Sequence, residues 1–327
     1  MKKLFNIFVV SFALVFSSSV FANKIGVVYD SGGKFDKSFN ELAFNTAERV
    51  KNELGWEMVE FESSNDAQIE QGMRKIADRG ATMIVGMGFA QADAVAAVSA
   101  DYPDIKFVAV DVCWLDDPNN NIYQACYKEH EGSFLVGMMA AMASKTGTIG
   151  FVGGMDIPLI RKFQGGYEQG AQYVNPDIEV LANMTGTTNE AWNNPTKGAE
   201  LTKAQIDGGA DVVYQAAGGT GIGVLQAAAD AGIMGIGVDA NQNWMHPGNM
   251  LTSMLKRLDL TIFAQAEAIA AGTFEPSGQF LSLGLAEGGV GYATEDGMVT
   301  DEMAAAADAA AADIASGAIV VADWSQE

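Results

Sequence analysis

The clearest hydrophobic pattern in the chain runs through residues 25–54, where an apolar run, a glycine loop and a helical repeat follow one another. Residues 25–29 are apolar and β-branched, which is typical of a strand buried on both faces of a parallel sheet. Ser38 followed by Glu41 predicts a capping box, and apolar positions then recur at helical spacing. Strand, loop and helix in this order predict the first half of a βαβ unit.

The same alternation of apolar runs and helical repeats continues along the first third of the chain. We expect further strands at 56–61, 81–87 and 106–111, and helices at 66–80 and 91–100. Short strands that alternate with helices predict a doubly wound, mostly parallel α/β sheet.

A second alternation follows. Its expected helices are 132–144, one from Pro158, one from about 196 and one ending at 231, and its expected strands are 148–152, 178–184, 211–215 and 233–239. Two such series in tandem predict two α/β lobes, in line with the length of 327 residues.

The last quarter of the chain is less regular. It predicts a helix at 256–271 that returns to the first lobe, a strand at 291–294, an alanine-rich helix at 301–315 and a short strand at 318–322. The expected division is therefore 23–128 plus about 254–281 for lobe 1, and 129–253 plus about 282–327 for lobe 2.

The first 22 residues have the pattern of a signal peptide. Lys2 and Lys3 precede an apolar run, and a small-x-Ala sequence ends at Ala22, so we expect cleavage there and a mature chain from Asn23. The residue directly after the expected cleavage site is Asn23 rather than a cysteine, which favours a periplasmic protein without a lipid anchor. The net charge of −22 argues against a nucleic-acid partner.

The two cysteines are Cys113 and Cys126. Export permits a disulfide, and a turn between the two residues could bring them together. Two buried free thiols are the alternative.

Candidate ligand-binding residues stand at the strand ends, because open parallel sheets bind ligands beyond the carboxyl ends of their strands. From lobe 1 these are Asp30, Ser31, Phe35, Asn40, Phe89 and Asp111, and from lobe 2 Trp192, Tyr214, Gly218, Gly219 and Asp239. Lys256 is a further candidate near the return crossing to lobe 1. Aromatic faces suit a planar heterocycle, carboxylates accept from ribose hydroxyls, and a carboxamide can read a base edge. The set predicts a nucleoside rather than a nucleotide, whose phosphate the carboxylates would repel.

These residue types also have structural explanations. A strand-end aspartate can cap the next helix, and Phe89 and Tyr214 can be packing residues. A dinucleotide loop is one residue short of its pattern at 219–223, and neither a nucleophile elbow nor a metal-ligand spacing is found. We therefore expect a binding protein without cofactor, and rank an enzyme last.

Five segments carry a family resemblance. They are KFDKSFN at 34–40, two long stretches at 128–154 and 157–178, AAGGTGIGV at 216–224 and GVDANQ at 237–242. In this order they resemble the basic membrane protein family, whose members are substrate-binding proteins of ABC importers and include a purine nucleoside receptor.

The resemblance implies a type I-like periplasmic binding protein with a three-segment hinge, a monomer that serves an ABC permease in the inner membrane. It implies that Phe35 stacks on the base, Asn40 bonds the base edge and Asp239 holds the ribose, with Asp111 and Lys256 as further polar contacts. The second stacking ring is Tyr214 or, alternatively, Trp192. A flavin or sugar ligand, or a receptor that presents its ligand to a sensor, remain alternatives.

Overall fold

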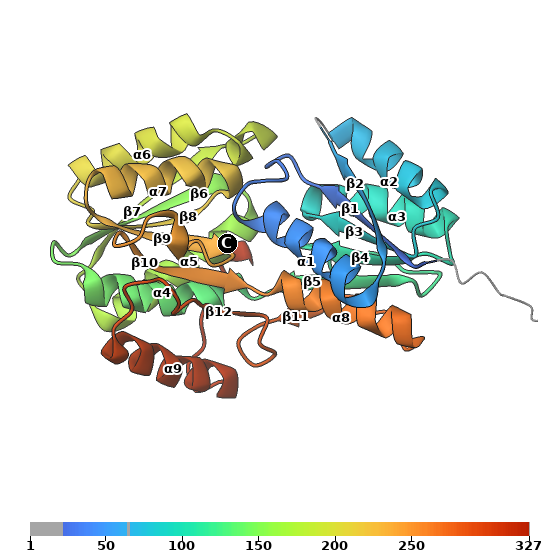
Figure 1. The fold of residues 1–327 in the computed structure, drawn as a ribbon. Coiled ribbons are helices and arrows are strands. Elements are labelled where there is room, and N and C mark those ends of the chain that lie inside the picture. The colour runs from blue at the N-terminus through green and yellow to red at the C-terminus, as the bar shows by residue number, and fades with distance from the viewer. Residues whose placement is uncertain (1–21, 64–65, 327) are drawn as a thin grey trace, which may run out of the picture.

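Two six-stranded sheets divide the chain into two lobes, as the computed structural model shows for residues 22–63 and 66–326 (Figure 1). The first sheet has the order β11-β5-β4-β3-β1-β2, and all its strand pairs are parallel. Its strands are β1 (Lys24–Tyr29), β2 (Glu57–Glu62), β3 (Met83–Met87), β4 (Lys106–Val110), β5 (Ile122–Tyr127) and β11 (Ser282–Leu283). The predicted signal peptide lies outside the described residues, except for Ala22.

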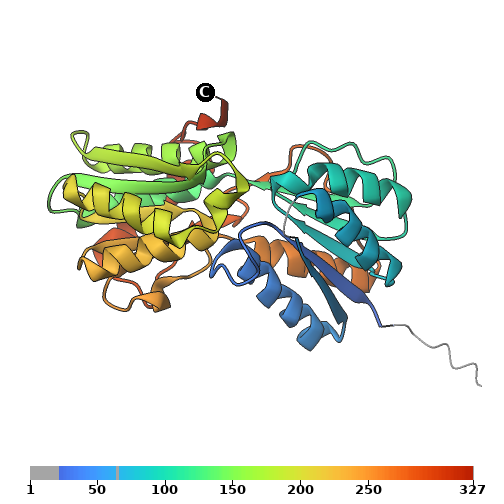
Figure 2. The same cartoon turned by 90° about the horizontal axis from the view of Figure 1, so that it is seen from above.

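Helices cover both faces of this first sheet. They are α1 (Phe39–Leu54), α2 (Ile69–Asp78), α3 (Ala92–Asp101) and α8 (Leu258–Ala271). Residues of α1 and α8 share one hydrophobic core with the sheet, and residues of α2 and α3 share the core on the opposite face. Helix α8 lies beside α1 in both views although it comes late in the chain (Figures 1 and 2).

The second sheet has the order β12-β10-β9-β8-β6-β7, parallel except where β12 meets β10. Its strands are β6 (Thr148–Met155), β7 (Glu179–Gly186), β8 (Val212–Ala216), β9 (Met234–Asp239), β10 (Met250–Lys256) and β12 (Val290–Tyr292). Its helices are α4 (Glu129–Ala143), α5 (Pro158–Val174), α6 (Pro195–Asp207), α7 (Gly221–Asp230) and α9 (Asp301–Ser316). The predicted doubly wound α/β fold in two lobes is therefore confirmed.

The described chain crosses between the sheets after β5, after β10 and after β11. Figure 2 shows these crossings as a narrow waist between the lobes. The strands that precede the crossings end at Tyr127, Lys256 and Leu283. A waist of this kind permits hinge motion of one lobe against the other.

Two predicted elements of the last quarter differ from the structure. Lys256 is the last residue of β10, a strand that the sequence analysis missed, and α8 begins only at Leu258. The span 318–322 is not a strand, because its backbone groups have other partners. The N–H groups of Ala318 and Ile319 donate to the carbonyl of Asp313 at the end of α9, and Ala322 bonds the side chain of Gln169.

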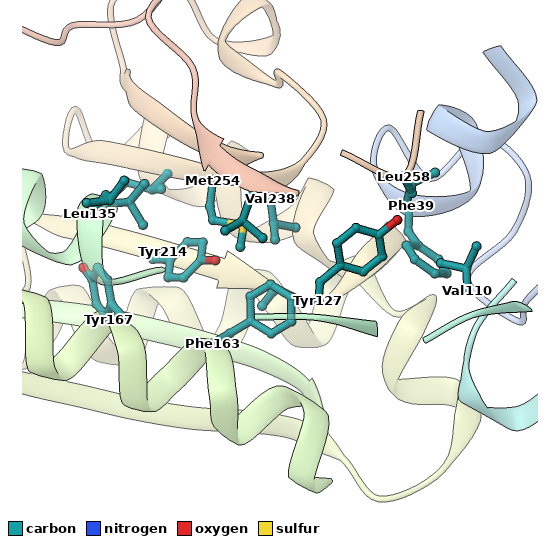
Figure 3. Packing of buried hydrophobic residues seen from close by; sticks show 14 of the residues in the cluster. Phe39, Val110, Tyr127, Leu135, Phe163, Tyr167, Tyr214, Val238, Met254 and Leu258 are labelled. Atoms are coloured by element: carbon teal, nitrogen blue, oxygen red, sulfur yellow. The ribbon is translucent and has the colours of Figure 1, made fainter. Parts of the chain in front are cut away.

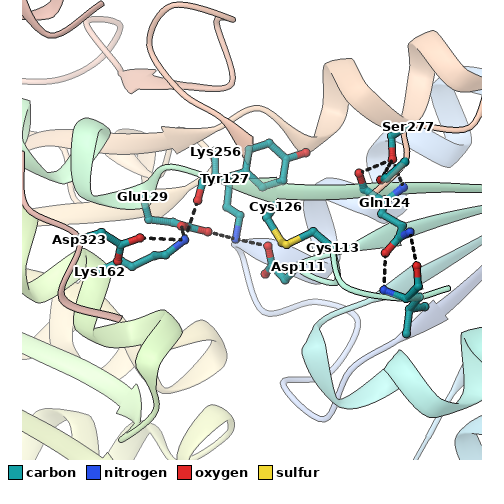
Figure 4. Close-up of a disulfide and its surroundings, with 12 residues drawn as sticks. Asp111, Cys113, Gln124, Cys126, Tyr127, Glu129, Lys162, Lys256, Ser277 and Asp323 are labelled. Atoms are coloured by element: carbon teal, nitrogen blue, oxygen red, sulfur yellow. Dashed lines mark hydrogen bonds and ion pairs between the residues drawn. A yellow bond between two sulfur atoms is a disulfide. The ribbon is translucent and has the colours of Figure 1, made fainter. Parts of the chain in front are cut away.

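Cys113 and Cys126 form a disulfide within lobe 1, with their Cα atoms 5.7 Å apart. It joins the segment after β4 to β5 (Figure 4). Within the described part of the chain, no helix combines the length and the apolar character needed to span a bilayer.

Candidate functional site

An inter-lobe cleft lies at the carboxyl ends of the strands of both sheets. Lobe 1 contributes Asp30, Gly32, Asp36, Phe39, Gly88, Phe89 and Asp111, and lobe 2 contributes Leu159, Ile160, Phe163, Trp192, Ala216, Gly218, Val238, Asp239 and Lys256. The cavity volume is about 60 Å³. Both lobes therefore have to supply any ligand site here, as expected for parallel sheets that face each other across a hinge.

A fully buried ammonium group stands at the base of the cleft. Lys256 Nζ lies 2.6 Å from Asp111 Oδ1 and 3.0 Å from Glu129 Oε1 (Figure 4). Burial alone would lower the pKa of Lys256, but the carboxylates of Asp111, Glu129 and Asp239 outweigh it and raise that pKa above its ordinary value. Lys256 is thus a fixed positive charge that holds together residues of lobe 1, the hinge and lobe 2.

The pKa values of the two carboxylates paired with Lys256 are shifted in opposite directions. Burial raises the pKa of Asp111 to about 6 against the opposing effect of Lys256. Burial also acts to raise the pKa of Glu129, but Lys256 and Lys162 outweigh it and hold that pKa below its usual range. Lys162 Nζ lies 3.3 Å from Glu129 Oε2 and donates to the carbonyl of Tyr127. The carboxylate of Asp111 is therefore easier to protonate than an ordinary aspartate, and that of Glu129 is harder to protonate than an ordinary glutamate.

Three aromatic rings surround the same ammonium group. Its Nζ lies 5.3 Å from the ring centre of Phe39, 5.1 Å from that of Tyr127 and 5.8 Å from that of Phe163. These distances are within the range of cation–π attraction. Phe39 and Phe163 come from opposite lobes and both line the cleft, so aromatic surface and charge meet in one place.

Asp239 ends β9 and faces lobe 1. Its backbone is in the left-handed region, with φ of 64°, and its Oδ2 accepts a hydrogen bond from Ser38 Oγ at 2.7 Å. Burial raises the pKa of Asp239, while Lys256 and the Ser38 hydroxyl act to lower it. Non-glycine residues adopt this backbone rarely, and such strain is concentrated at functional sites.

The predicted capping box at Ser38 is wrong. The Ser38 side chain makes no capping hydrogen bond, and the carboxylate of Asp36 instead accepts from the N–H groups of Ser38, Asn40 and Glu41. Burial raises the pKa of Asp36 to about 7, although these three N–H groups act to lower it. Asp36 caps α1, and the hydroxyl of Ser38 is left to reach the other lobe.

Asn40 supports the loop that precedes it. Its Oδ1 accepts from the backbone N–H of Asp30 at 3.1 Å, and its Nδ2 donates to Asp30 Oδ1 at 2.6 Å and to the carbonyl of Gly33 at 3.2 Å. Both amide hydrogens are used inside the loop, and the residue is fully buried. The geometry therefore gives no support to the predicted contact between Asn40 and a base edge.

Phe35 does not line the cleft. Its side chain is 58% exposed and packs edge-on against Phe44, with ring centres 5.5 Å apart. Phe39, four residues later, is the ring of this motif that faces the cleft. Phe39 also fits the apolar helical repeat that predicted α1, so the sequence analysis did not propose it as a cleft residue. One signal could have identified it. Phe39 is the first residue of α1, and the helix starts that follow strands of a parallel sheet lie at the edge where ligands bind.

Tyr214 is a core residue rather than a cleft residue. It is fully buried, its hydroxyl lies 3.2 Å from Ser133 Oγ, and its ring packs on Phe151. The ring also packs on Tyr167 (Figure 3). Of the two rings considered for lobe 2, only Trp192 lines the cleft.

The remaining predicted residues divide between the cleft and its rim. Asp30, Phe89, Asp111, Gly218, Asp239 and Lys256 line the cavity, and Ser31 does not. A Cβ on Gly219 would lie 3.0 Å from the carbonyl of Gly32 in the opposite lobe, so Gly219 belongs to the closely packed rim. The sequence analysis missed Asp36, Phe39, Phe163 and Glu129. Among the described residues no cluster of metal ligands is present.

Comparisons with known proteins agree with this architecture. Residues 22–324 match the family model described as "ABC transporter substrate-binding protein PnrA-like". Basic membrane protein A2 of Borrelia garinii subsp. bavariensis is 34% identical over 286 residues, which cover 86% of this chain and 82% of the relative. The ABC transporter nucleoside-binding protein BmpA of Lactococcus lactis subsp. cremoris is 31% identical over 320 residues, 91% of this chain and 88% of the relative.

A solved structure is similar over almost the same span. The solute-binding protein of an ABC transporter system from Aeropyrum pernix K1 has a TM-score of 0.82 at 27% identity, covering 92% of this chain and 93% of that one. Proteins of this family bind substrates for ABC transporters and are not enzymes. The chain belongs to the Bmp family of PnrA-like substrate-binding proteins of ABC transporters.

Proposed function

We propose that this protein captures a nucleoside-like ligand in the inter-lobe cleft and presents it to an ABC importer. The observation that carries the proposal is that aromatic rings and carboxylates of both lobes line the same cavity. A nucleoside needs both kinds of surface, because its base is planar and its sugar carries hydroxyl donors. The nucleoside-binding relative from Lactococcus lactis supports this ligand class.

The aromatic half of the cleft suits the base. Phe39 and Phe89 come from lobe 1, and Phe163 and Trp192 from lobe 2. Rings on both sides of a hinge can enclose a planar heterocycle when the lobes close. Stacking of a base on an aromatic side chain contributes roughly 1–3 kcal/mol in nucleic-acid complexes, enough to favour a planar ligand over a sugar alone.

The polar half suits the ribose. Asp111 and Asp239 lie at opposing strand ends, and Lys256 lies beside them. Ionised carboxylates accept strongly from hydroxyl groups. The only ammonium group in the described cleft lining is already paired with Asp111 and Glu129, so the cleft offers no cation for a phosphate. We therefore propose a nucleoside rather than a nucleotide.

Binding requires the lobes to move. The cavity of about 60 Å³ is well below the roughly 300–1,000 Å³ of typical small-molecule sites. A nucleoside can enter only if the lobes separate at the three crossings, and closure then encloses it. We propose that a permease recognises the closed form.

We also propose that capture takes place in the periplasm, by a monomer that serves an inner-membrane permease. Substrate-binding proteins of ABC importers act outside the cytoplasmic membrane, and the predicted signal peptide agrees with export. Light scattering on the purified protein checks the monomer, and uptake of labelled ligand in cells that lack the protein checks the transport role.

A thermal-shift panel tests the ligand class. The protein is refolded to remove carried ligand and heated with nucleosides, free bases, nucleotides, riboflavin and sugars in turn. A ligand that binds only the folded state raises the melting temperature with its concentration. We expect nucleosides to give the largest shift. A larger shift with riboflavin or a sugar would contradict a nucleoside ligand and assign the cleft to that compound class instead. Chemical turnover of any compound would contradict a binding role.

A further inference from the structure

A hydrogen-bonded contact joins the two lobes at the cleft, beside the chain crossing that follows β10. Ser38, in the last position before α1, lies with its Oγ 2.7 Å from Asp239 Oδ2 and 3.1 Å from the carbonyl of Val238. Gln242 of lobe 2 donates from its Nε2 to the carbonyl of Lys37 at 3.0 Å. Ser38 and Gln242 are fully buried, so water does not compete for these bonds.

Both sides of this contact are held in place by their own lobe. In lobe 1, Asp36 occupies the N–H groups at the start of α1, which leaves the Ser38 hydroxyl without a capping role. In lobe 2, Gln242 Oε1 accepts from the N–H of Val238 at 2.9 Å and from Gln215 at 2.8 Å. The donor and the acceptor are therefore oriented before the lobes meet.

The backbone on each side is strained. Lys37 has φ of 62° and Asp239 has φ of 64°, in the left-handed region that side chains other than glycine rarely adopt. Strained residues persist where the surrounding structure holds them, and they cluster at ligand clamps and switches. The strain here is at the two positions that aim Ser38 and Asp239 at each other.

We infer that Ser38 is a positioning residue that couples lobe closure to the orientation of the Asp239 carboxylate. Closure brings the Ser38 hydroxyl to Oδ2 of Asp239. This bond fixes the orientation of a carboxylate whose residue lines the cleft. The closed form is thus stabilised by a direct inter-lobe bond as well as by any ligand, and release of ligand requires this bond to break.

Inter-lobe distances measured by electron spin resonance test the inference without a ligand. Spin labels on Lys75→Cys in α2 and Lys203→Cys in α6 report the separation of the lobes, since both positions are exposed and the native cysteines are held in the disulfide. Ser38→Ala should shift the ligand-free distances towards an open form. The matched control is Ser99→Ala, a buried serine of α3 whose hydroxyl donates to the carbonyl of Ala96 in the same helix, and it should leave the distances unchanged.

A kinetic measurement separates positioning from general destabilisation, and this part rests on the proposed function. Loss of a hydrogen bond to a charged group should raise the nucleoside dissociation rate about tenfold or more and leave the association rate nearly unchanged. Asp239→Asn, which keeps the shape but supplies a weaker acceptor, should shift the distances in the same direction by less.

The outcomes separate this inference from the proposed function. Distances in Ser38→Ala that match those of the parent protein would overturn the inference, whether or not nucleosides bind. An open shift in Ser38→Ala together with no nucleoside binding to the parent protein would support the inter-lobe contact and contradict the ligand class. If Ser38→Ala does not fold, the distances in Asp239→Asn decide in the same way.

Discussion

Asp30 and Asp239 have equivalent places in the two lobes, yet their carboxylates have different partners. Each stands at the carboxyl end of a parallel strand, β1 or β9, and each lines the inter-lobe cleft. Asp30 Oδ1 accepts from the N–H of Gly32 at 2.8 Å and from Asn40 at 2.6 Å, the first in the loop after β1 and the second in the first turn of α1, both in its own lobe. Asp239 Oδ2 accepts from Ser38 of the other lobe.

The difference follows from where each loop directs its amide side chains. In lobe 1, Asn40 turns back to Asp30 and closes the loop on itself. In lobe 2, Gln242 bonds the N–H of Val238 and Asn243 bonds Ser253, so neither serves Asp239. The Asp30 carboxylate therefore stabilises its own loop, because the Asn40 side chain bonds it. The Asp239 carboxylate is available to the other lobe, because the amide side chains of Gln242 and Asn243 bond other groups.

The largest expected effect concerns Lys256. Its buried ammonium group balances the negative charges of Asp111, Glu129 and Asp239. Lys256→Met should lower the free energy of unfolding by about 3–5 kcal/mol, because Asp111 would remain buried without its ion-pair partner and Glu129 would keep only Lys162. Urea unfolding measures the loss. Lys51→Met is the control, since its exposed pair with Glu48 should be worth at most about 1 kcal/mol. Equal losses in both variants would contradict a structural dependence on Lys256.

The second effect concerns Asp36, in the lobe 1 loop between β1 and α1. Burial raises the pKa of Asp36 to about 7, so the folded state binds a proton that the unfolded state has released between about pH 4 and 7. The contribution of Asp36 to the unfolding free energy therefore falls as pH rises through this window, by at most about 4 kcal/mol. Asp36→Asn should flatten the measured pH profile between these values. A profile that keeps its wild-type slope would show that Asp36 does not titrate there.

The third effect compares the two aspartates directly. Asp239→Asn should weaken nucleoside binding by roughly 1.5–3 kcal/mol while changing the affinity for the free base much less, because the carboxylate accepts from the sugar. Asp30→Asn should have a smaller effect on the sugar, since an amide oxygen can still accept from Gly32 and Asn40. Calorimetric titration of both variants with nucleoside and base measures this. Equal losses of nucleoside affinity in Asp239→Asn and Asp30→Asn would show that the two aspartates do not differ in their role towards the sugar.

The smallest effect concerns two rings of one motif. Phe39→Leu should weaken binding of base and nucleoside alike by about 1–2 kcal/mol, because it removes a flat face from the cleft. Phe35→Leu should leave both affinities nearly unchanged, because the Phe35 ring lies on Phe44 and 58% of it is exposed. Fluorescence titration of the two variants suffices. A larger loss in Phe35→Leu would return the stacking role to Phe35.

The elements of the fold were largely predictable, because apolar runs and helical repeats are local signals. Strand β10 was missed since Thr252 and Ser253 interrupt its apolar run, although both are buried. Their hydroxyl groups bond Ala293 and Asn243, partners distant in sequence. A polar residue satisfied by a distant partner cannot be distinguished from a loop residue by periodicity.

The sequence predicted only those cleft residues that stand at strand ends or in family motifs. Asp111, Asp239 and Lys256 were found because they end strands or match family motifs. Phe39 was hidden because it also fits the apolar stripe of α1, and Ser38 because it also fits a capping box. Glu129 gave no local signal, since its role depends on Lys162 and Lys256 from distant segments. Residues with two local explanations need the tertiary structure to decide between them.

Calorimetric titration of the refolded wild-type protein with a purine nucleoside, its free base and ribose tests the central claim most directly. If the cleft binds base and sugar together, the nucleoside should bind at least about tenfold more tightly than the base, because the carboxylate contacts to the sugar contribute roughly 1.5–3 kcal/mol. Ribose should bind more weakly than the nucleoside, because it lacks the stacking contribution of roughly 1–3 kcal/mol. A nucleoside that binds no more tightly than its free base, or does not bind at all, would contradict the account.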